Sequence, residues 1–194
     1  MFIRTEETPN PLTLKFIPGR EVMADGVREF ATPEEAAESP LAEALFDVDG
    51  VARVYFGPDF LTVTKGSDEV DWRNIQASIL AAIMDWYASG EPLFVGGAAE
   101  AGTSHGHAEE TYEGDAAQIV AEIKDLLDTR IRPAVAQDGG DILFSRYEPD
   151  TGIVWLHMRG ACAGCPSSAA TLKSGVENML RHYVPEVSRV EQTV

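Results

Sequence analysis

Residues 142–168, ILFSRYEPDTGIVWLHMRGACAGCPSS, decide how the second half of this chain folds. Residues 142–147 and 153–158 are both rich in the apolar and aromatic residues that favour strands. Residues 149–152, Pro-Asp-Thr-Gly, have the composition of a turn. The stretch therefore predicts a β-hairpin whose second strand leads into a cysteine-containing segment.

The two cysteines of the chain, Cys162 and Cys165, lie directly after this hairpin. Residues 166–168, Pro-Ser-Ser, are typical of the first turn of a helix. Unpaired backbone N–H groups and the positive end of the helix dipole at such a position favour thiolate over thiol. Gly164 lets the backbone curl so that both sulfurs point one way. We therefore expect the chemistry of the protein at this pair.

Four interpretations of the pair stay open on spacing alone. A cubane or binuclear iron–sulfur cluster needs about four thiolates, so two subunits would each supply one pair. Zinc meets the same shortage of ligands. Thiol–disulfide exchange also suits a Cys-x-x-Cys segment at a helix start. Two small buried hydrophobic side chains fit badly with a glycine-rich helix entry. Within one chain, the histidines available to complete a zinc site are His105, His107, His157 and His182.

Composition limits the classes of function. The net charge of −17 disfavours general binding to nucleic acid, and no apolar run approaches the length of a membrane span. Two closely spaced cysteines are not the disulfide framework of a small secreted domain. Residues 1–7 have neither signal-peptide nor transit-peptide character. These features predict a bacterial-type cytoplasmic protein, or a mature form that has already been processed.

A Gly-, Ala- and acid-rich stretch divides the chain. Residues 96–110 contain almost no large apolar side chain, which predicts a flexible linker. We therefore expect an N-terminal domain at 1–95, a flexible acidic linker at 96–113 and a C-terminal domain at 114–194. Residues 1–113 carry −14 of the net charge and residues 114–194 carry −3. The histidines at 105 and 107 fall in the linker, where we expect them to be solvated.

The first domain is predicted to be a small α+β unit without a reactive cluster of side chains. Alternating apolar residues predict strands at 12–17, 51–56 and 60–65. Ser39 and Pro40 predict the start of a short helix, as N-cap and first helical residue. Trp72 leads into a second helix. Its apolar face contains Ile75, Ile79, Ile83 and Trp86.

The second domain is also predicted to be α+β. An amphipathic helix from Ile119 to Ile131 is expected to end at Pro133 or just beyond. After the turn at 137–141 and the hairpin, a closing helix presents an apolar face, and residues 187–194 are expected to form an edge strand. The apolar face contains Leu172, Val176, Met179, Leu180 and Tyr183. The fold class is therefore α+β, with two small domains joined by a linker.

Longer motifs surround these elements. Residues 131–141, IRPAVAQDGGD, with 160–168, GACAGCPSS, 171–173, TLK, and 185–187, PEV, strongly resemble the NifU C-terminal domain. The N-terminal half is similar to the domain found upstream in Nfu-type scaffold proteins. The matching segments there are TPNP at 8–11, LKF at 14–16 and FLTVTK at 60–65.

The resemblance implies a non-enzymatic iron–sulfur cluster scaffold or carrier. It implies that Cys162 and Cys165 are the ligands of a labile [4Fe–4S] cluster, with [2Fe–2S] as the alternative, held between two subunits of a homodimer. Recipients would be apo iron–sulfur proteins, and the cluster would come from upstream assembly machinery. We expect the Asp138–Asp141 segment to be a structural turn that supports the sheet, with dimer contact or cluster release as the lesser alternative. The rival functions are a thiol–disulfide oxidoreductase and a zinc-stabilised interaction module.

Overall fold

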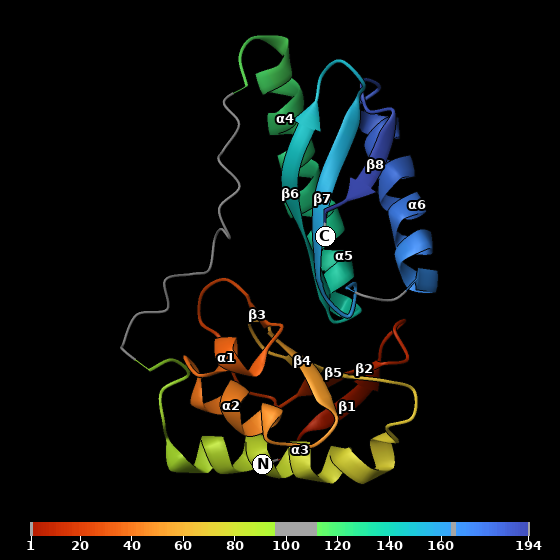
Figure 1. Cartoon of the computed structure of the whole chain (residues 1–194). Coiled ribbons are helices and arrows are strands. Elements are labelled where there is room, and N and C mark those ends of the chain that lie inside the picture. Colours follow the sequence, from red (N-terminus) through yellow and green to blue (C-terminus); the bar gives the residue numbers. More distant parts are fainter. Residues whose placement is uncertain (1, 96–111, 164–165, 194) are drawn as a thin grey trace. The chain divides into compact units, whose positions relative to one another are not determined.

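Each half of the chain folds around its own sheet. The structure, a computed structural model, describes residues 2–95, 112–163 and 166–193, and the side chains at 166–169 and 171 are left out. The chain divides into two units, Met1–Thr103 and Ser104–Val194, and both combine helices with a sheet (Figure 1). The predicted α+β class with two domains is therefore confirmed. Residues 96–111 of the predicted linker lie outside the described residues.

The first unit is built on a five-stranded antiparallel sheet with the strand order β1-β2-β5-β4-β3. Its strands are β1 (Arg4–Glu7), β2 (Thr13–Ile17), β3 (Arg28–Phe30), β4 (Val51–Phe56) and β5 (Leu61–Lys65). The predicted pairing of β4 with β5 is present, with Val54 opposite Val63 and Phe56 opposite Leu61. The central strands thus align their apolar side chains on one face.

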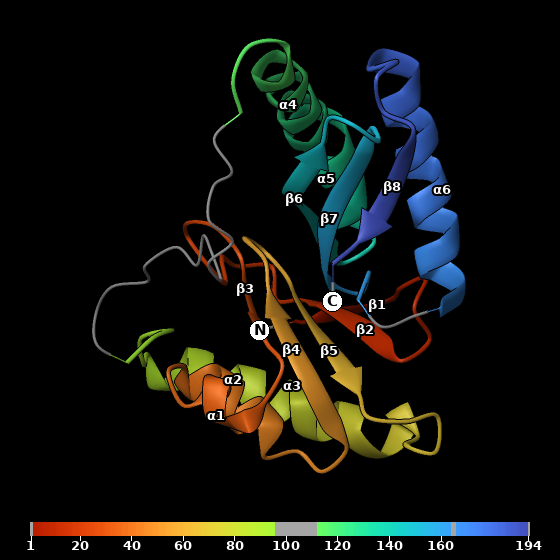
Figure 2. The same ribbon diagram turned by 45° about the horizontal axis from the view of Figure 1, so that its top comes forward.

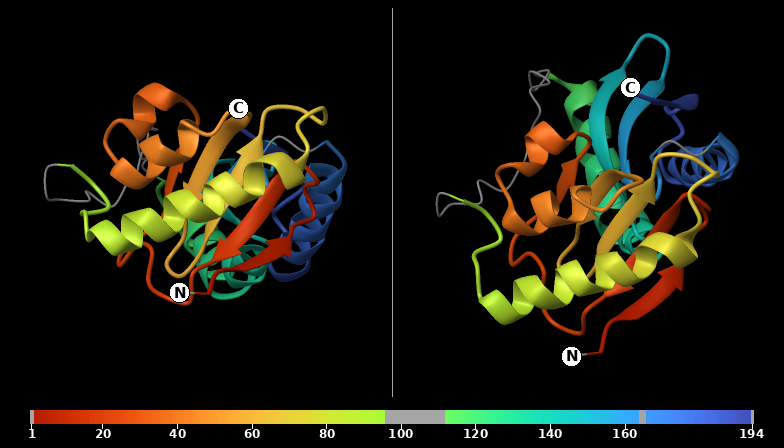
Figure 3. Two further views of the ribbon diagram at one scale, coloured as in Figure 1. Left: turned by 90° about the horizontal axis from the view of Figure 1, so that it is seen from below. Right: turned by 60° about the horizontal axis from the view of Figure 1, so that its bottom comes forward.

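Three helices accompany this sheet: α1 (Pro33–Ala36), α2 (Pro40–Phe46) and α3 (Trp72–Ser89). Ser39 is the N-cap of α2, as predicted, and its side chain accepts a hydrogen bond from the backbone N–H of Ala42. α3 runs across the strands (Figure 3). Its predicted apolar residues Ile75, Ile79 and Ile83 are buried in the core with side chains of the central strands. The two longer helices therefore cover one face of the sheet.

Three short elements were not predicted, namely β1, β3 and α1. The sequence of β1, Arg-Thr-Glu-Glu, has no apolar alternation because β1 is an edge strand that pairs with β2 alone. Charged residues on an edge strand discourage pairing with other chains, so they replace the usual strand pattern there. The four-residue α1 and the three-residue β3 are too short for periodicity to reveal.

The second unit is built on a three-stranded sheet with the order β6-β7-β8 (Figure 2). The predicted hairpin is formed by β6 (Gly140–Glu148) and β7 (Ile153–Gly160), which pair antiparallel. The final strand β8 (Arg189–Gln192) is shorter than the predicted 187–194 and pairs parallel to β7 at the edge of the sheet. A parallel pairing requires a crossover, which the closing helix α6 (Pro166–Tyr183) supplies.

The helical segment before the sheet extends further than predicted. It consists of α4 (Asp115–Leu126), a π-helical turn η1 (Leu127–Ile131) and α5 (Arg132–Gln137). A proline has no N–H to donate and crowds the carbonyl four residues earlier, so a regular helix would break near Pro133. The wider π-helical turn that precedes Pro133 accommodates it, and the helical path continues to Gln137. Val120, Ile123 and Ile131 are buried against the sheet in the core of this unit.

Candidate functional site

Cys162 lies in a tight turn that follows β7. The backbone N–H of Cys162 donates to the carbonyl of Arg159 at 3.3 Å, and that of Ala163 donates to Gly160 at 3.0 Å. The N–H of Ala161 crosses to the carbonyl of Gly139 at 3.1 Å. The turn is therefore tied both to the end of β7 and to the residue before β6. The side chain of Cys162 is buried and belongs to the core of the second unit.

The second predicted ligand, Cys165, lies outside the described residues, as does Gly164. The backbone resumes at Pro166, where α6 begins. A strand thus ends before the cysteine segment and a helix begins after it, as the sequence predicts. The N-terminal N–H groups of a helix have no partner within the helix, so they favour negative charge near its start.

Gly140 packs directly against Cys162. A Cβ atom at residue 140 would overlap the Sγ of Cys162 and would lie 3.0 Å from the carbonyl oxygen of Arg159 and 3.1 Å from the backbone N of Cys162. In the sheet, Gly140 is the partner of Gly160, the last residue of β7. Any side chain at residue 140 would displace the sulfur of Cys162. The observed conformation of the cysteine turn therefore requires glycine at this position.

Asp141, the second residue of β6, holds the start of this strand in place from the protein interior. Its buried carboxylate accepts two hydrogen bonds from Arg132, at 2.7 Å from Nε and 3.1 Å from Nη2. A third, from Nη1 of Arg132 to Asp128, measures 2.8 Å. The hydrogen bonds to Asp141, and then to Asp128, raise the pKa of Arg132 above its ordinary value, against the opposing effect of burial. This pair fixes the first residues of β6 to α5, and through Gly140 it supports the cysteine turn.

Sequence reasoning did not assign a role to Arg132 or to the individual residues Gly140 and Asp141. The Asp138–Asp141 segment was expected to be a supporting turn, and the structure adds that it supports the turn of Cys162. The available signal was the pair of adjacent glycines followed by an acidic residue directly before a strand. Adjacent glycines at such a place indicate a close approach of another part of the backbone.

Of the candidate histidine ligands, the structure describes His157 and His182, and neither is placed beside Cys162. In β7, Val154, Leu156 and Met158 belong to the core, so the alternation of a strand directs His157 to the other face of the sheet. There its Nδ1 lies 3.4 Å from the hydroxyl of Thr193. His182 is at the end of α6, about 24 Å from the helix start by its rise of 1.5 Å per residue. The histidines at 105 and 107 lie outside the described residues.

The described residues contain no other group of metal-binding side chains. Among residues 2–95, 112–163 and 166–193, no three His, Cys, Asp or Glu side chains are grouped so that they could hold a metal ion. None of the helices in these ranges has the length and apolar character needed to cross a membrane.

Comparison with known families gives two matches. A family model described as "Scaffold protein Nfu/NifU N terminal" matches residues 3–90. A second, described as "NifU-like domain", matches residues 123–191 and therefore contains the cysteine segment. The first match lies within the first unit of the chain, and the second match lies within the second unit.

Three curated relatives match nearly the whole chain. NifU-like protein 4, mitochondrial, of Arabidopsis thaliana is 53% identical over 192 residues, which cover 99% of this chain and 66% of the relative. NifU-like protein 5, mitochondrial, of the same plant is 53% identical, with coverages of 99% and 68%. NFU1 iron-sulfur cluster scaffold homolog, mitochondrial, of Homo sapiens is 49% identical over 199 residues, with coverages of 100% and 72%. The chain spans about two thirds of the length of these relatives.

The names of these relatives correct one prediction. All three are mitochondrial proteins, so the expectation of a bacterial-type cytoplasmic protein is wrong. That expectation depended on net charge, the lack of a long apolar run, cysteine usage and the composition of residues 1–7, and the same features are also those of a processed mature form.

Family membership follows from the match to the human relative together with the two family models. The human relative is 49% identical and 72% of its length is covered, and the two family models account for segments in both units. The resemblance noted in the sequence is therefore confirmed. The chain belongs to the Nfu/NifU family.

Proposed function

We propose that this chain is an iron–sulfur cluster scaffold and carrier. Cys162 and Cys165 of two copies hold a labile [4Fe–4S] cluster as cargo, and the dimer passes it to apo iron–sulfur proteins. The observation that carries the proposal is the placement of Cys162, in a turn fixed by backbone hydrogen bonds and by the contact with Gly140. A [2Fe–2S] cluster is the alternative cargo.

The number of ligands supports a shared cluster. A cubane or binuclear cluster is held by about four thiolates, and the whole chain contains two cysteines. Because His157 faces away from the core and His182 is far along α6, neither is placed to complete the set in one chain. Two copies that each contribute one Cys-x-x-Cys segment supply four thiolates, so the cluster itself would join the homodimer.

The position of Cys162 between a strand end and a helix start supports a role as a thiolate ligand. The segment is short, and it follows a strand end and precedes a helix start, where unpaired N–H groups favour the negative charge of thiolates and sulfides. In transfer, thiols of the recipient would replace the four cysteines one at a time. Each incoming thiol loses its proton to the thiolate that it displaces, so charge and protons balance. A recipient with a more complete set of ligands retains the cluster.

The family supports the same conclusion. The human relative is named as an iron–sulfur cluster scaffold homolog, and the family model of the first unit is described as that of a scaffold protein. Scaffolds bind and deliver rather than catalyse, so we propose that the chain is not an enzyme. Its partners would then be an upstream assembly machinery that loads the cluster and apo-proteins that receive it.

Anaerobic reconstitution with iron and sulfide tests the proposal. We expect visible absorption, a shift from monomer toward dimer in sedimentation and about four irons per dimer. Cys162→Ala and Cys165→Ala should each abolish the chromophore and the cluster-linked dimer, while Ser174→Ala, an exposed site on α6, should change neither. Incubation of the holo protein with an apo-enzyme that needs [4Fe–4S] should then restore the activity of that enzyme.

Other outcomes distinguish the alternatives. A colourless protein that binds one zinc would indicate an interaction module. Catalysed exchange with glutathione disulfide, without any bound iron, would indicate a thiol–disulfide oxidoreductase. Retention of a full cluster by either cysteine variant would show that the ligand assignment is incorrect.

A further inference from the structure

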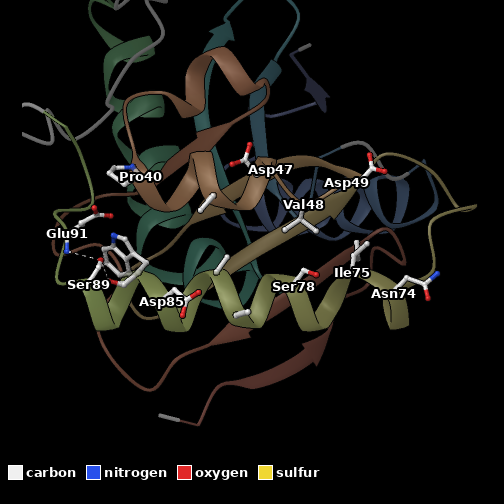
Figure 4. A pocket seen from close by; sticks show the side chains of 14 residues that line it. Pro40, Asp47, Val48, Asp49, Asn74, Ile75, Ser78, Asp85, Ser89 and Glu91 are labelled. Carbon is white, nitrogen blue, oxygen red and sulfur yellow. Dashed lines mark hydrogen bonds between the residues drawn. The ribbon is translucent and has the colours of Figure 1, made fainter.

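A groove lies on the first unit between α2 and α3. Its volume is about 700 Å³. Figure 4 shows Pro40 and Glu91 at one end and Asp49 and Asn74 at the other, with side chains of α3 directed toward α2. The groove belongs to a single unit, far in sequence from the cysteine segment.

The floor of the groove is apolar and made of small residues. The residues of α3 that line it recur every three or four positions from Asn74 to Ser89, so they occupy one face of the helix. At 1.5 Å per residue this face is about 22 Å long. In its middle lie Ser78, Ala81 and Ala82, whose short side chains let another backbone approach closely. The dimensions match a helix of about four turns.

The rim of the groove is acidic. Asp47, Asp49, Asp85 and Glu91 line it, and no lysine or arginine does. No salt bridge of the described residues involves any of these four carboxylates. Trp86 also lines the groove, and its buried indole N–H finds no acceptor among the described residues. The surface therefore offers apolar contacts and uncompensated negative charge.

Charge disfavours the linker and a second copy of this chain as occupants of the groove. Residues 96–113, the predicted linker, contain Glu100, Glu109, Glu110 and Glu113 and no lysine or arginine. A second copy of the whole chain carries a net charge of −17. Both would be repelled by an acidic rim. We propose that the groove docks a cationic amphipathic helix of another protein, with its apolar face on the floor and its lysines or arginines at the rim. The proposal does not depend on cluster binding.

The test uses the full-length apo protein and a synthetic probe. The probe is a fluorescein-labelled 16-residue helical peptide with leucines along one face and lysines on its flanks. One control peptide has glutamate in place of every lysine, and the other has the same composition with the leucines scattered around the helix. We expect the first peptide to bind and both controls to bind at least about tenfold more weakly. The glutamate peptide lacks the positive charge that complements the rim, and the scattered peptide lacks the continuous apolar face that complements the floor. Binding should weaken as NaCl is raised, because salt screens exposed charges.

Matched variants locate the binding site. Ala81→Arg places a large cation on the floor, and we expect at least about a tenfold loss of affinity. Ala77→Arg adds the same charge to an exposed position of α3 that does not line the groove, and should change the affinity by less than about threefold. Ser78→Arg serves as a second floor variant if Ala81→Arg does not fold. Asp85→Asn should weaken binding by about two- to fivefold.

Backbone amide shifts in NMR give the location independently, and we expect the largest changes at Ser78, Ala81 and Ala82. The proposal is overturned if the glutamate peptide binds as well as the lysine peptide, if Ala81→Arg leaves the affinity unchanged, or if the lysine peptide does not bind at low salt. Binding of a small apolar dye in the groove without binding of the peptide would also overturn it, in favour of a small-molecule site. None of these results depends on whether the protein holds a cluster.

Discussion

Replacement of Gly140 by alanine tests the idea that this glycine makes room for the cysteine turn. The added Cβ would overlap the Sγ of Cys162 and would lie 3.0 Å from one backbone atom and 3.1 Å from another. An ordinary non-bonded separation is about 3.5–4.0 Å, so the sulfur must move by roughly 1 Å or more. Gly140 does not have a positive φ, so alanine adds no backbone strain there.

The expected magnitude follows from two opposing effects. Overpacking of a tight contact costs about 1–3 kcal/mol. Alanine also reduces the conformational freedom of the unfolded chain, which stabilises the folded protein by about 0.5–1 kcal/mol. We therefore expect Gly140→Ala to lower the free energy of unfolding of the second unit by about 1–2 kcal/mol. For a domain of this size the melting temperature would fall by about 5–15 °C. The moved sulfur should also shorten the half-life of a reconstituted cluster by about tenfold, as expected for a lost supporting contact at a metal site.

The matched control is Gly175→Ala in α6. A Cβ at residue 175 meets no atom within 4 Å, so the same substitution should stabilise the helix by up to about 1 kcal/mol and leave the cluster unchanged. Calorimetry on the full chain measures the melting of each unit, and absorbance after addition of an iron chelator measures the cluster half-life. If Gly140→Ala and Gly175→Ala behave alike in both measurements, the contact between Gly140 and Cys162 does not determine the position of the sulfur.

Three further predictions concern other contacts of the second unit. Asp141→Asn weakens the pair with Arg132 and should lower the free energy of unfolding by about 1–3 kcal/mol, measured by urea titration. Tyr112→Phe removes a hydroxyl that donates to the carbonyl of Tyr147 and accepts from its N–H, and should cost about 1–2 kcal/mol in the same assay. The hydrogen bond from Lys173 lowers the pKa of Glu191 in the folded protein. The stabilising effect of this hydrogen bond is therefore present above the unfolded pKa of Glu191 and is lost as pH falls through the folded pKa. Lys173→Met should return the pKa of Glu191 toward its ordinary value in a carboxyl NMR titration, and an unchanged pKa would contradict this cause.

The sequence predicts those elements whose pattern is local. Ile75, Ile79 and Ile83 recur at helical spacing, and Ser39 and Pro40 have the chemistry of a helix start, so α3 and α2 follow directly. The hairpin of β6 and β7 follows from two apolar runs around a turn. The edge strand β1 could not be found in this way, because its charged residues serve to prevent aggregation rather than to fill a core.

The supports of the site depend on contacts between separated residues, which local patterns do not encode. Arg132 and Asp141 are nine residues apart, and they meet only because the π-helical turn carries the helical path past Pro133 and the chain then reverses into β6. The need for glycine at 140 appears only when β6 lies beside the end of β7, where residue 162 comes into contact. The Cys-x-x-Cys spacing indicated where the chemistry takes place, but not what holds Cys162 in position.

The proposed groove and the proposed cluster site lie in different units, so their independence can be tested. The groove depends on small residues of α2 and α3 and on carboxylates within and beside these helices, whereas the position of Cys162 depends on Gly140 and on the pair of Arg132 and Asp141. The two units have separate hydrophobic cores, so substitutions in one should not alter the packing of the other. Ala81→Arg should therefore leave cluster content and half-life unchanged, and Gly140→Ala should leave peptide affinity unchanged. If either substitution affected both properties, the units would be energetically coupled, and docking of a partner helix would then regulate the cluster rather than simply bring a partner to it.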